Sequence, residues 1–212
     1  GSHHSTPKPK GYSDEEMGPA CNAEFVFIAG SAFGEPVRDN IGMYFDTAAT
    51  QHCDPSIPPG PDEIDIYLVA TNVGALGGII GWECEISWTG PAFDEDYLVE
   101  TMNGEFLNFE NEPDFAVGLT EALPNIGGTI LLMTMTITVD GPEPIHFYID
   151  GLRFGHTLPE RVPAYANGSN PAIVLELFQS TGGPDYPVLS INDDCAVANQ
   201  EETWSAVKEL FR

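Results

Sequence analysis

Residues 81–88, with the sequence GWECEISW, constrain the fold of this chain more than any other segment. Apolar and polar side chains alternate along it, with Trp82, Cys84, Ile86 and Trp88 set against Glu83, Glu85 and Ser87. Successive side chains of a strand point to opposite faces of a sheet. The alternation therefore predicts a β-strand with one buried face and one solvated face.

Other segments with the length and composition of short strands follow one another along most of the chain. They are residues 21–30, 42–47, 63–72, 97–101, 105–110, 114–120, 129–139, 145–150, 172–179 and 187–193. Two of them alternate clearly, and their predicted buried residues are Ile64, Ile66, Leu68 and Ala70 in one and Leu131, Met133, Met135, Ile137 and Val139 in the other. Clusters of Gly and Pro separate the segments, which predicts a mainly β chain with a single antiparallel β-sandwich over residues 21–200.

The two ends of the chain depart from this β pattern. Residues 1–20 are polar and contain several prolines, which predicts an extended N-terminal arm; the opening letters GSHH are either native or left by a purification tag. Residues 201–212 predict a short C-terminal α-helix, with an apolar side made of Trp204, Val207, Leu210 and Phe211. A helix of this length is marginal alone in water, so it must dock either on its own domain or on a neighbouring molecule.

The charge of the chain is strongly negative and unevenly distributed. Seven Lys and Arg oppose 33 Asp and Glu, a formal charge of −26. Binding to nucleic acid or to an anionic membrane surface needs clustered Lys and Arg, so both are excluded. The positive residues of the two ends are Lys8, Lys10, Lys208 and Arg212. A basic arm beside an acidic body predicts either a contact with a neighbouring copy, a contact with its own domain, or a solvated tail.

The four cysteines are Cys21, Cys53, Cys84 and Cys195. They form no CxxC pair, so neither a zinc ribbon nor a thioredoxin-like site is indicated. An even number in a Gly- and Pro-rich β chain favours two disulfides in an oxidising compartment over four buried thiols. The spacing leaves all three pairings open. No apolar stretch has the length of a membrane span.

The candidate chemistry of the chain is sparse. Glu83 and Glu85 share one face of a strand, as a glycosidase pair or as an ordinary polar face. Clusters of acidic residues at 62–65, 94–96 and 193–194 contain the oxygen ligands that calcium prefers, although none has an EF-hand pattern. No nucleophile elbow or phosphate-binding loop is present. We therefore expect no enzymatic activity, no required cofactor and no metal site beyond a weak calcium candidate.

Two features fit a secreted protein that recognises sugars or carries them. Asn167, in the triplet NGS, is a sequon for N-glycosylation in an expected loop. The residues expected to be exposed as a sugar-binding platform are Tyr12, Tyr97, Tyr165 and Tyr186.

Short motifs also resemble known groups of proteins. IGMYFDTAATQHC (41–53), INDDC (191–195) and TWSAVKELFR (203–212) together resemble a group of secreted proteins from environmental bacteria. The resemblance implies an exported Ig-like β-sandwich with Cys53 paired to Cys195 and Cys21 to Cys84, and a C-terminal helix used in sorting or assembly. GGIIGWECEISW (77–88) and GGTILLMTMTITV (127–139) are similar to the central strands of cohesin-type sandwiches.

These features lead to two functional hypotheses. The first is a structural subunit of an extracellular filament or surface assembly, a homo-oligomer that polymerises through its N-terminal arm. The residues expected to carry that assembly are Lys8, Lys10, Tyr12, Trp204, Val207, Leu210 and Phe211. The second is a cell-surface module, cohesin-like or carbohydrate-binding, that acts as a monomer.

Overall fold

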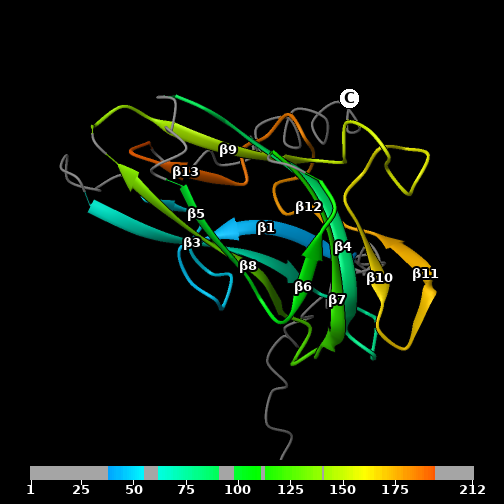
Figure 1. Cartoon of the computed structure of the whole chain (residues 1–212). Helices are drawn as coiled ribbons and strands as arrows, with labels where there is room; N and C mark the ends of the chain where they lie inside the picture. Colours follow the sequence, from blue (N-terminus) through cyan, green and yellow to red (C-terminus); the bar gives the residue numbers. More distant parts are fainter. Residues whose placement is uncertain (1–37, 55–61, 91–97, 111–112, 140, 194–212) are drawn as a thin grey trace, which may run out of the picture. The chain divides into compact units, whose positions relative to one another are not determined.

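The computed structural model describes residues 38–54, 62–90, 98–110, 113–139 and 141–193 (Figure 1). The residues so described form strands, turns and loops, with no helix. The strands are β1 (Asn40–Tyr44), β2 (Cys53–Asp54), β3 (Asp62–Thr71), β4 (Ile79–Thr89), β5 (Leu98–Met102), β6 (Phe106–Asn108), β7 (Asp114–Leu123), β8 (Ile130–Val139), β9 (Ile145–Asp150), β10 (Ala164–Asn167), β11 (Asn170–Glu176), β12 (Phe178–Gln179) and β13 (Leu189–Ile191).

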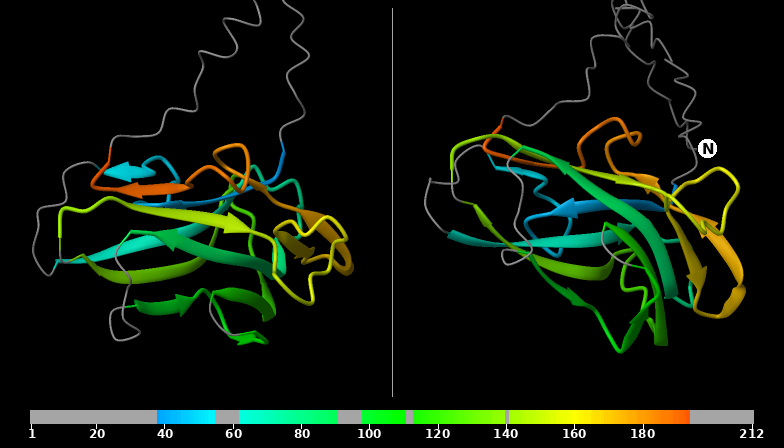
Figure 2. Two further views of the ribbon diagram at one scale, coloured as in Figure 1. Left: turned by 90° about the horizontal axis from the view of Figure 1, so that it is seen from above. Right: turned by 45° about the horizontal axis from the view of Figure 1, so that its top comes forward.

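The strands form two sheets, seen from two further sides in Figure 2. One sheet has the order β12-β1-β3-β8-β5. The other has the order β11-β10-β4-β9-β13-β2, with β7 on the second edge of β4 and β6 beyond β7. Residues of both sheets share one hydrophobic core, so the described part of the chain is a β-sandwich.

The alternation of residues 81–88 is confirmed as a strand with a buried face. Trp82, Cys84 and Ile86 of β4 lie in the core. They belong to one core cluster with buried side chains of the five-stranded sheet, among them Ile66 and Leu68 of β3. In the predicted face of 63–72, Ile66, Leu68 and Ala70 are buried and Ile64 is half-buried, and the predicted face of the second half of 129–139 is buried.

The first half of residues 129–139 differs in register from the prediction. Leu132 is fully buried and Leu131 only half-buried, the reverse of the sequence expectation. A β-bulge explains the difference, because Val69 pairs with Leu131 while Leu68 pairs with Met133, which leaves Leu132 as the extra residue.

Three further differences from the sequence expectations concern strand pairing. Residues 172–179 are two strands, β11 in one sheet and β12 in the other, with the buried Leu177 at the change of sheet. The short strands β2 and β10 were not predicted. The pairs β1–β12 and β2–β13 are parallel, in an otherwise antiparallel sandwich. The expected strand 21–30, the arm 1–20 and the helix 201–212 lie outside the described residues, so they stay predictions.

Strands β9 and β10 lie in line along the same edge of β4. Asp150 at the end of β9 pairs with Glu85, and Ala164 at the start of β10 pairs with Glu83. Residues 151–163 therefore form a loop that leaves the edge of β4 beside Glu85 and returns to it beside Glu83, two residues away along β4. A Cβ on Gly151 would lie 2.4 Å from the carbonyl carbon of Arg161, so a glycine is required where the two ends of this loop meet.

Candidate functional site

Three carboxylates lie in a row across the outer face of the eight-stranded sheet. Glu85 of β4 pairs with Asp114 of β7 on one side and with Asp150 of β9 on the other. Directly paired residues share a face and have close Cβ atoms, so like charges at these positions repel one another. The row can persist only if cations lie over it.

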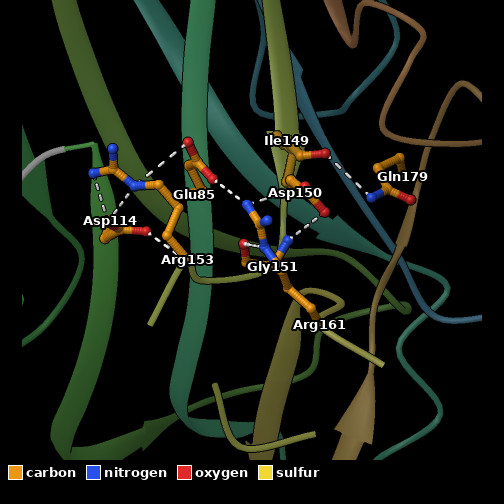
Figure 3. Close-up of polar contacts among 8 residues, drawn as sticks. All are labelled: Glu85, Asp114, Ile149, Asp150, Gly151, Arg153, Arg161 and Gln179. Atoms are coloured by element: carbon orange, nitrogen blue, oxygen red, sulfur yellow. Dashed lines mark hydrogen bonds and ion pairs between the residues drawn. The ribbon is translucent and has the colours of Figure 1, made fainter. Parts of the chain in front are cut away.

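Two arginines of loop 151–163 supply those cations (Figure 3). Arg153 Nη2 lies 2.7 Å from Asp114 Oδ2, and its Nε lies 3.7 Å from Glu85 Oε1. Arg161 Nη2 lies 2.9 Å from Glu85 Oε2 and 3.4 Å from Asp150 Oδ2. The hydrogen bond to Asp114 raises the pKa of Arg153 above its ordinary value. The arginines thus hold the loop on the sheet.

A third attachment of the loop involves Glu83, whose side chain is 9% exposed. The backbone N–H of Thr157 donates to Glu83 Oε1 at 2.7 Å, and the Thr157 hydroxyl donates to Oε2 at 2.7 Å. Glu83 and Glu85 were expected on a solvated face or as a catalytic pair. Both are instead committed to contacts with the loop, so the expectation of a solvated face is wrong for Glu83.

An apolar groove lies beside this loop on the same outer face. Its volume is about 220 Å³. Apart from Glu83, the outward-facing residues of three neighbouring strands that form its floor are small: Gly81, Ala116, Gly118, Ala164 and Ala166. Val174, Phe109 and Thr157 line its sides. Figure 1 shows the strands concerned, β7, β4, β10 and β11, side by side.

The groove is hollow because the sheet has no large side chain there. Gly81 pairs with Gly118 on one side and with Ala166 on the other, so one row of the sheet has almost no side-chain volume. The ring of Phe109 lies over Gly118, and a Cβ on that glycine would lie 3.2 Å from Phe109 Cε2. The glycine therefore allows Phe109 to form one wall.

Large apolar side chains are exposed around the groove. Leu107 and Phe109 of the β6 region are 65% and 70% exposed, and Phe154 of loop 151–163 is 80% exposed. Phe106 is 43% exposed, but it pairs with the buried Leu119 and so lies on the opposite face of the sheet. Monomeric soluble proteins rarely expose contiguous apolar patches without a function. We call the groove and the side chains of Leu107, Phe109 and Phe154 the groove surface.

A hydroxyl, an imidazole and a carboxylate meet elsewhere on the same sheet. His146 Nδ1 lies 3.1 Å from Ser190 Oγ, and His146 Nε2 lies 3.4 Å from Asp193 Oδ2. These residue types serve in nucleophilic catalysis. Ser190, however, pairs directly with His146 across β13 and β9 and is only 4% exposed. The contact therefore joins two strands and does not present an accessible nucleophile.

The structure excludes one of the possible cysteine pairings and leaves the others as predictions. Cys53 of β2 and Cys84 of β4 are separated by β9 and β13 in the same sheet. Three strand spacings amount to roughly 14 Å, well beyond the reach of a disulfide. A bond between Cys53 and Cys84 is therefore excluded. Cys21 and Cys195 lie outside the described residues, so the pairing implied by the resemblance stays a prediction.

Asn167 lies at the tip of the hairpin that joins β10 to β11. Its side-chain oxygen accepts the backbone N–H of Ser169 at 2.9 Å. The turn is thus an ordered one, and glycosylation of Asn167 stays a prediction.

The expected tyrosine platform is not supported where the structure tests it. Tyr186 is exposed, but Tyr165 is buried and donates its hydroxyl to Asp39. Burial above all, together with that carboxylate, raises the pKa of Tyr165. Tyr12 and Tyr97 lie outside the described residues.

The acidic clusters show no metal site in the part of the chain that the structure describes. No group of three or more His, Cys, Asp or Glu there is arranged to hold an ion. Asp65 accepts the hydroxyl of Thr136 at 2.8 Å. Residues 94–96 and 194 lie outside the described part, as do the expected assembly residues Lys8, Lys10, Tyr12, Trp204, Val207, Leu210 and Phe211. Within the described ranges no helix is long and apolar enough to cross a membrane.

One pattern in the sequence indicates the groove surface, although it was not part of the predictions above. In FAVGL (115–119) the inward residues are large, but the outward residues are Ala116 and Gly118. Outward positions of a strand that faces solvent are usually polar, so small apolar residues there indicate a covered or recognising face. The contribution of Gly81 and Ala166 required the strand pairing, which the sequence did not contain.

No family model and no curated protein matches the sequence. Among solved structures, the chain is similar to the second type II cohesin module from the cellulosomal adaptor ScaA scaffoldin of Acetivibrio cellulolyticus. The identity is 11% and the TM-score 0.46, over 74% of this chain and 98% of that module.

Proposed function

We propose that this chain is a non-catalytic protein-interaction module, extracellular or on a cell surface, that binds its partner on the groove surface. The observation that supports this most directly is the small-residue floor bounded by Phe109. A Gly and Ala row gives a sheet little benefit from side-chain packing. It does allow another molecule to approach the backbone closely.

The size of the groove favours a side chain as its occupant. Its volume of about 220 Å³ is below the range of roughly 300–1,000 Å³ that is usual for small-molecule pockets. Protein interfaces instead concentrate their binding energy in a few aromatic or Arg anchors in well-packed pockets. The expected partner therefore inserts one large apolar side chain.

The charge of the sandwich favours a basic partner. The cations of the described residues are Arg38, Arg153 and Arg161. Arg153 and Arg161 are paired with carboxylates, and Arg38 lies 4.5 Å over the ring of Phe178. Acidic side chains thus dominate the surface, which steers positively charged partners toward it.

Selection of peptides from a displayed random library tests the proposal. The full wild-type chain should enrich peptides with an aromatic anchor and flanking Lys or Arg. Ala166→Tyr, which fills the groove, and Phe109→Ala, which removes a wall, should each weaken binding of those peptides at least tenfold. Leu76→Ala removes another highly exposed apolar side chain and serves as the matched control. Equal binding by all variants would contradict the proposal.

The filament hypothesis is a second proposal, supported by the separation of charge along the sequence. In it, the arm 1–20 binds the acidic body of the next copy. Deletion of residues 1–20 should abolish assemblies seen by negative-stain microscopy. Filaments that persist after the deletion would reject the arm as the assembling element.

A further inference from the structure

We propose that the groove surface of one copy binds residues 201–212 of a second copy, with Trp204 as the anchor. This inference rests on the proposed function of the groove surface and names its partner. The occupant should have one large apolar side chain, nearby positive charge and too little stability to fold alone. Residues 201–212 contain a large aromatic side chain, Trp204, and the cations Lys208 and Arg212 alongside three glutamates, and as a helix they are marginal alone in water.

The spacing of this segment matches the surroundings of the groove. Trp204, Lys208 and Arg212 recur every four residues, so in a helix they lie along one side at steps of roughly 6 Å. Glu176 of β11 pairs with Ala164 of the floor, and Glu110 adjoins Phe109 on the opposite side. Carboxylates therefore flank the groove on both sides, within reach of a cation one or two helical turns from the anchor.

The floor also suits a helix as the occupant. A helix packs on a sheet through side chains of both elements, and small residues on the sheet allow a large anchor to fill the space between them. The ring of Phe109 is 70% exposed and is available for an aromatic pair with Trp204.

The direction of the chain favours a second copy over the same copy. Strand β13 runs parallel to β4, because both are antiparallel to β9. The last residue of β13, Ile191, pairs with Ile145, which lies beside the C-terminal end of β4. Gly81 of the groove lies near the other end of β4. The level of Ile191 is about nine residues, or roughly 30 Å, from the groove.

The connecting segment is only just long enough for this distance. Residues 192–200 span at most roughly 32 Å when fully extended. Loop 151–163 also stands on the sheet between the two places, held over Glu83 and Glu85. An intramolecular contact would need a nearly straight connector, which is entropically costly. A second copy imposes no such condition.

Such a contact joins two different surfaces of identical molecules. The tail leaves one end of the sheet and the groove surface lies toward the other, so the contact is heterologous. Heterologous contacts build rings or open chains. The expected product is a head-to-tail series of copies.

Sedimentation of the full-length chain over a range of concentrations tests the inference. Wild type should form concentration-dependent oligomers. Trp204→Ala, which removes the anchor, and Ala166→Tyr, which fills the groove, should each weaken self-association at least about 30-fold, the effect of truncating a hot spot. Glu202→Ala, on the same segment, is the control and should assemble like wild type.

Mixing the two variants gives the decisive result. Trp204→Ala keeps an intact groove and Ala166→Tyr keeps an intact tail, so an equimolar mixture should form dimers and nothing larger. Phe109→Ala replaces Ala166→Tyr if circular dichroism shows that the latter is misfolded. A wild type that is monomeric throughout, a Trp204→Ala variant that assembles normally, or a mixture without dimers would each overturn the inference. Displayed peptides that still bind the wild-type groove in those cases would leave the proposed function standing.

Discussion

The two sheets of the sandwich bury similar side chains but present different outer faces. On the five-stranded sheet, Thr134, Thr136 and Thr138 of β8 lie opposite Tyr67, Asp65 and Glu63 of β3. On the eight-stranded sheet, the corresponding positions of β4, β7 and β10 are glycines, alanines and carboxylates covered by a loop. The outer face of the five-stranded sheet is polar and needs no partner to cover it. That of the eight-stranded sheet has the apolar groove, which we propose is occupied by a partner.

This difference shows that strands with the same alternation of buried and outward residues can form two kinds of outer face. Threonines and acids in alternation with buried residues give a face that needs no partner, because every polar group is solvated or paired locally. Small residues in the same positions leave backbone and apolar area accessible. The contrast therefore separates a face that maintains solubility from a face suited to recognition.

The largest expected effect concerns the attachment of loop 151–163. Gly151→Ala places a Cβ against the backbone of Arg161 and Val162, which cannot move without opening the loop. Unfolding by urea should show a loss of about 3 kcal/mol or more. Gly183→Ala is the control, since its Cβ would meet only Tyr186 Cδ2 at 4.0 Å, and its change should stay within about 0.5 kcal/mol. Equal effects of the two changes would mean that the loop ends are not held.

A matched pair of threonines compares the two faces directly. Thr157 donates to the buried Glu83 at 2.7 Å, and Thr136 donates to the exposed Asp65 at 2.8 Å. Thr157→Val should cost about 1–3 kcal/mol, because it leaves a buried carboxylate with one donor fewer. Thr136→Val should change the free energy of unfolding by less than about 0.5 kcal/mol. Thr157→Ser should restore most of the loss, and a larger loss at Thr136 would reverse the comparison.

Alkaline pH should weaken the region beneath the groove. The pKa of Tyr165 is raised in the folded state, so its stabilising contribution is complete below about pH 10, the value in the unfolded chain. The contribution is lost as pH rises above that value toward the folded pKa. Thermal unfolding at successive pH values should therefore show a steeper decline in wild type than in Tyr165→Phe. Part of the decline should remain, since burial above all raises the pKa of Tyr44 as well.

The smallest expected effect is the response of stability to salt. Screening relieves the repulsion among the acidic side chains, so the melting temperature should rise by a few degrees between 0.05 M and 1 M NaCl. The double variant Arg153→Ala, Arg161→Ala should gain more than wild type, because its carboxylate row is left without cations. A smaller gain for the double variant would mean that Arg153 and Arg161 do not neutralise that row.

Much of the fold followed from local sequence, and much of the site did not. Alternation in 63–72 and 81–88 indicated the strands and their buried faces, since period two is set by backbone geometry. The bulge at Leu132 and the change of sheet at Leu177 were not predictable, because each depends on pairing with distant strands.

The groove surface illustrates the same limit. Gly81, Gly118 and Ala166 come from three separate parts of the chain and become neighbours only through the register of β4 with β7 and β10. The interpretation of Glu83 failed for a related reason, since its partner Thr157 is 74 residues away. A carboxylate on a strand gives no local sign of whether water or a loop will cover it.

Loop 151–163, which separates β9 from β10 along the edge of β4, can vary in sequence more freely than the strands. The loop leaves and rejoins the edge of β4 at neighbouring positions. Its residues between the two ends, other than Arg153, Thr157 and Arg161, which attach the loop to the sheet, can therefore be varied without shifting any strand. The wall of the groove at Thr157 and the exposed ring of Phe154 belong to that segment. Under the proposed function, grafting these variable residues onto a constant scaffold should exchange the binding preference, as antibody frameworks exchange theirs.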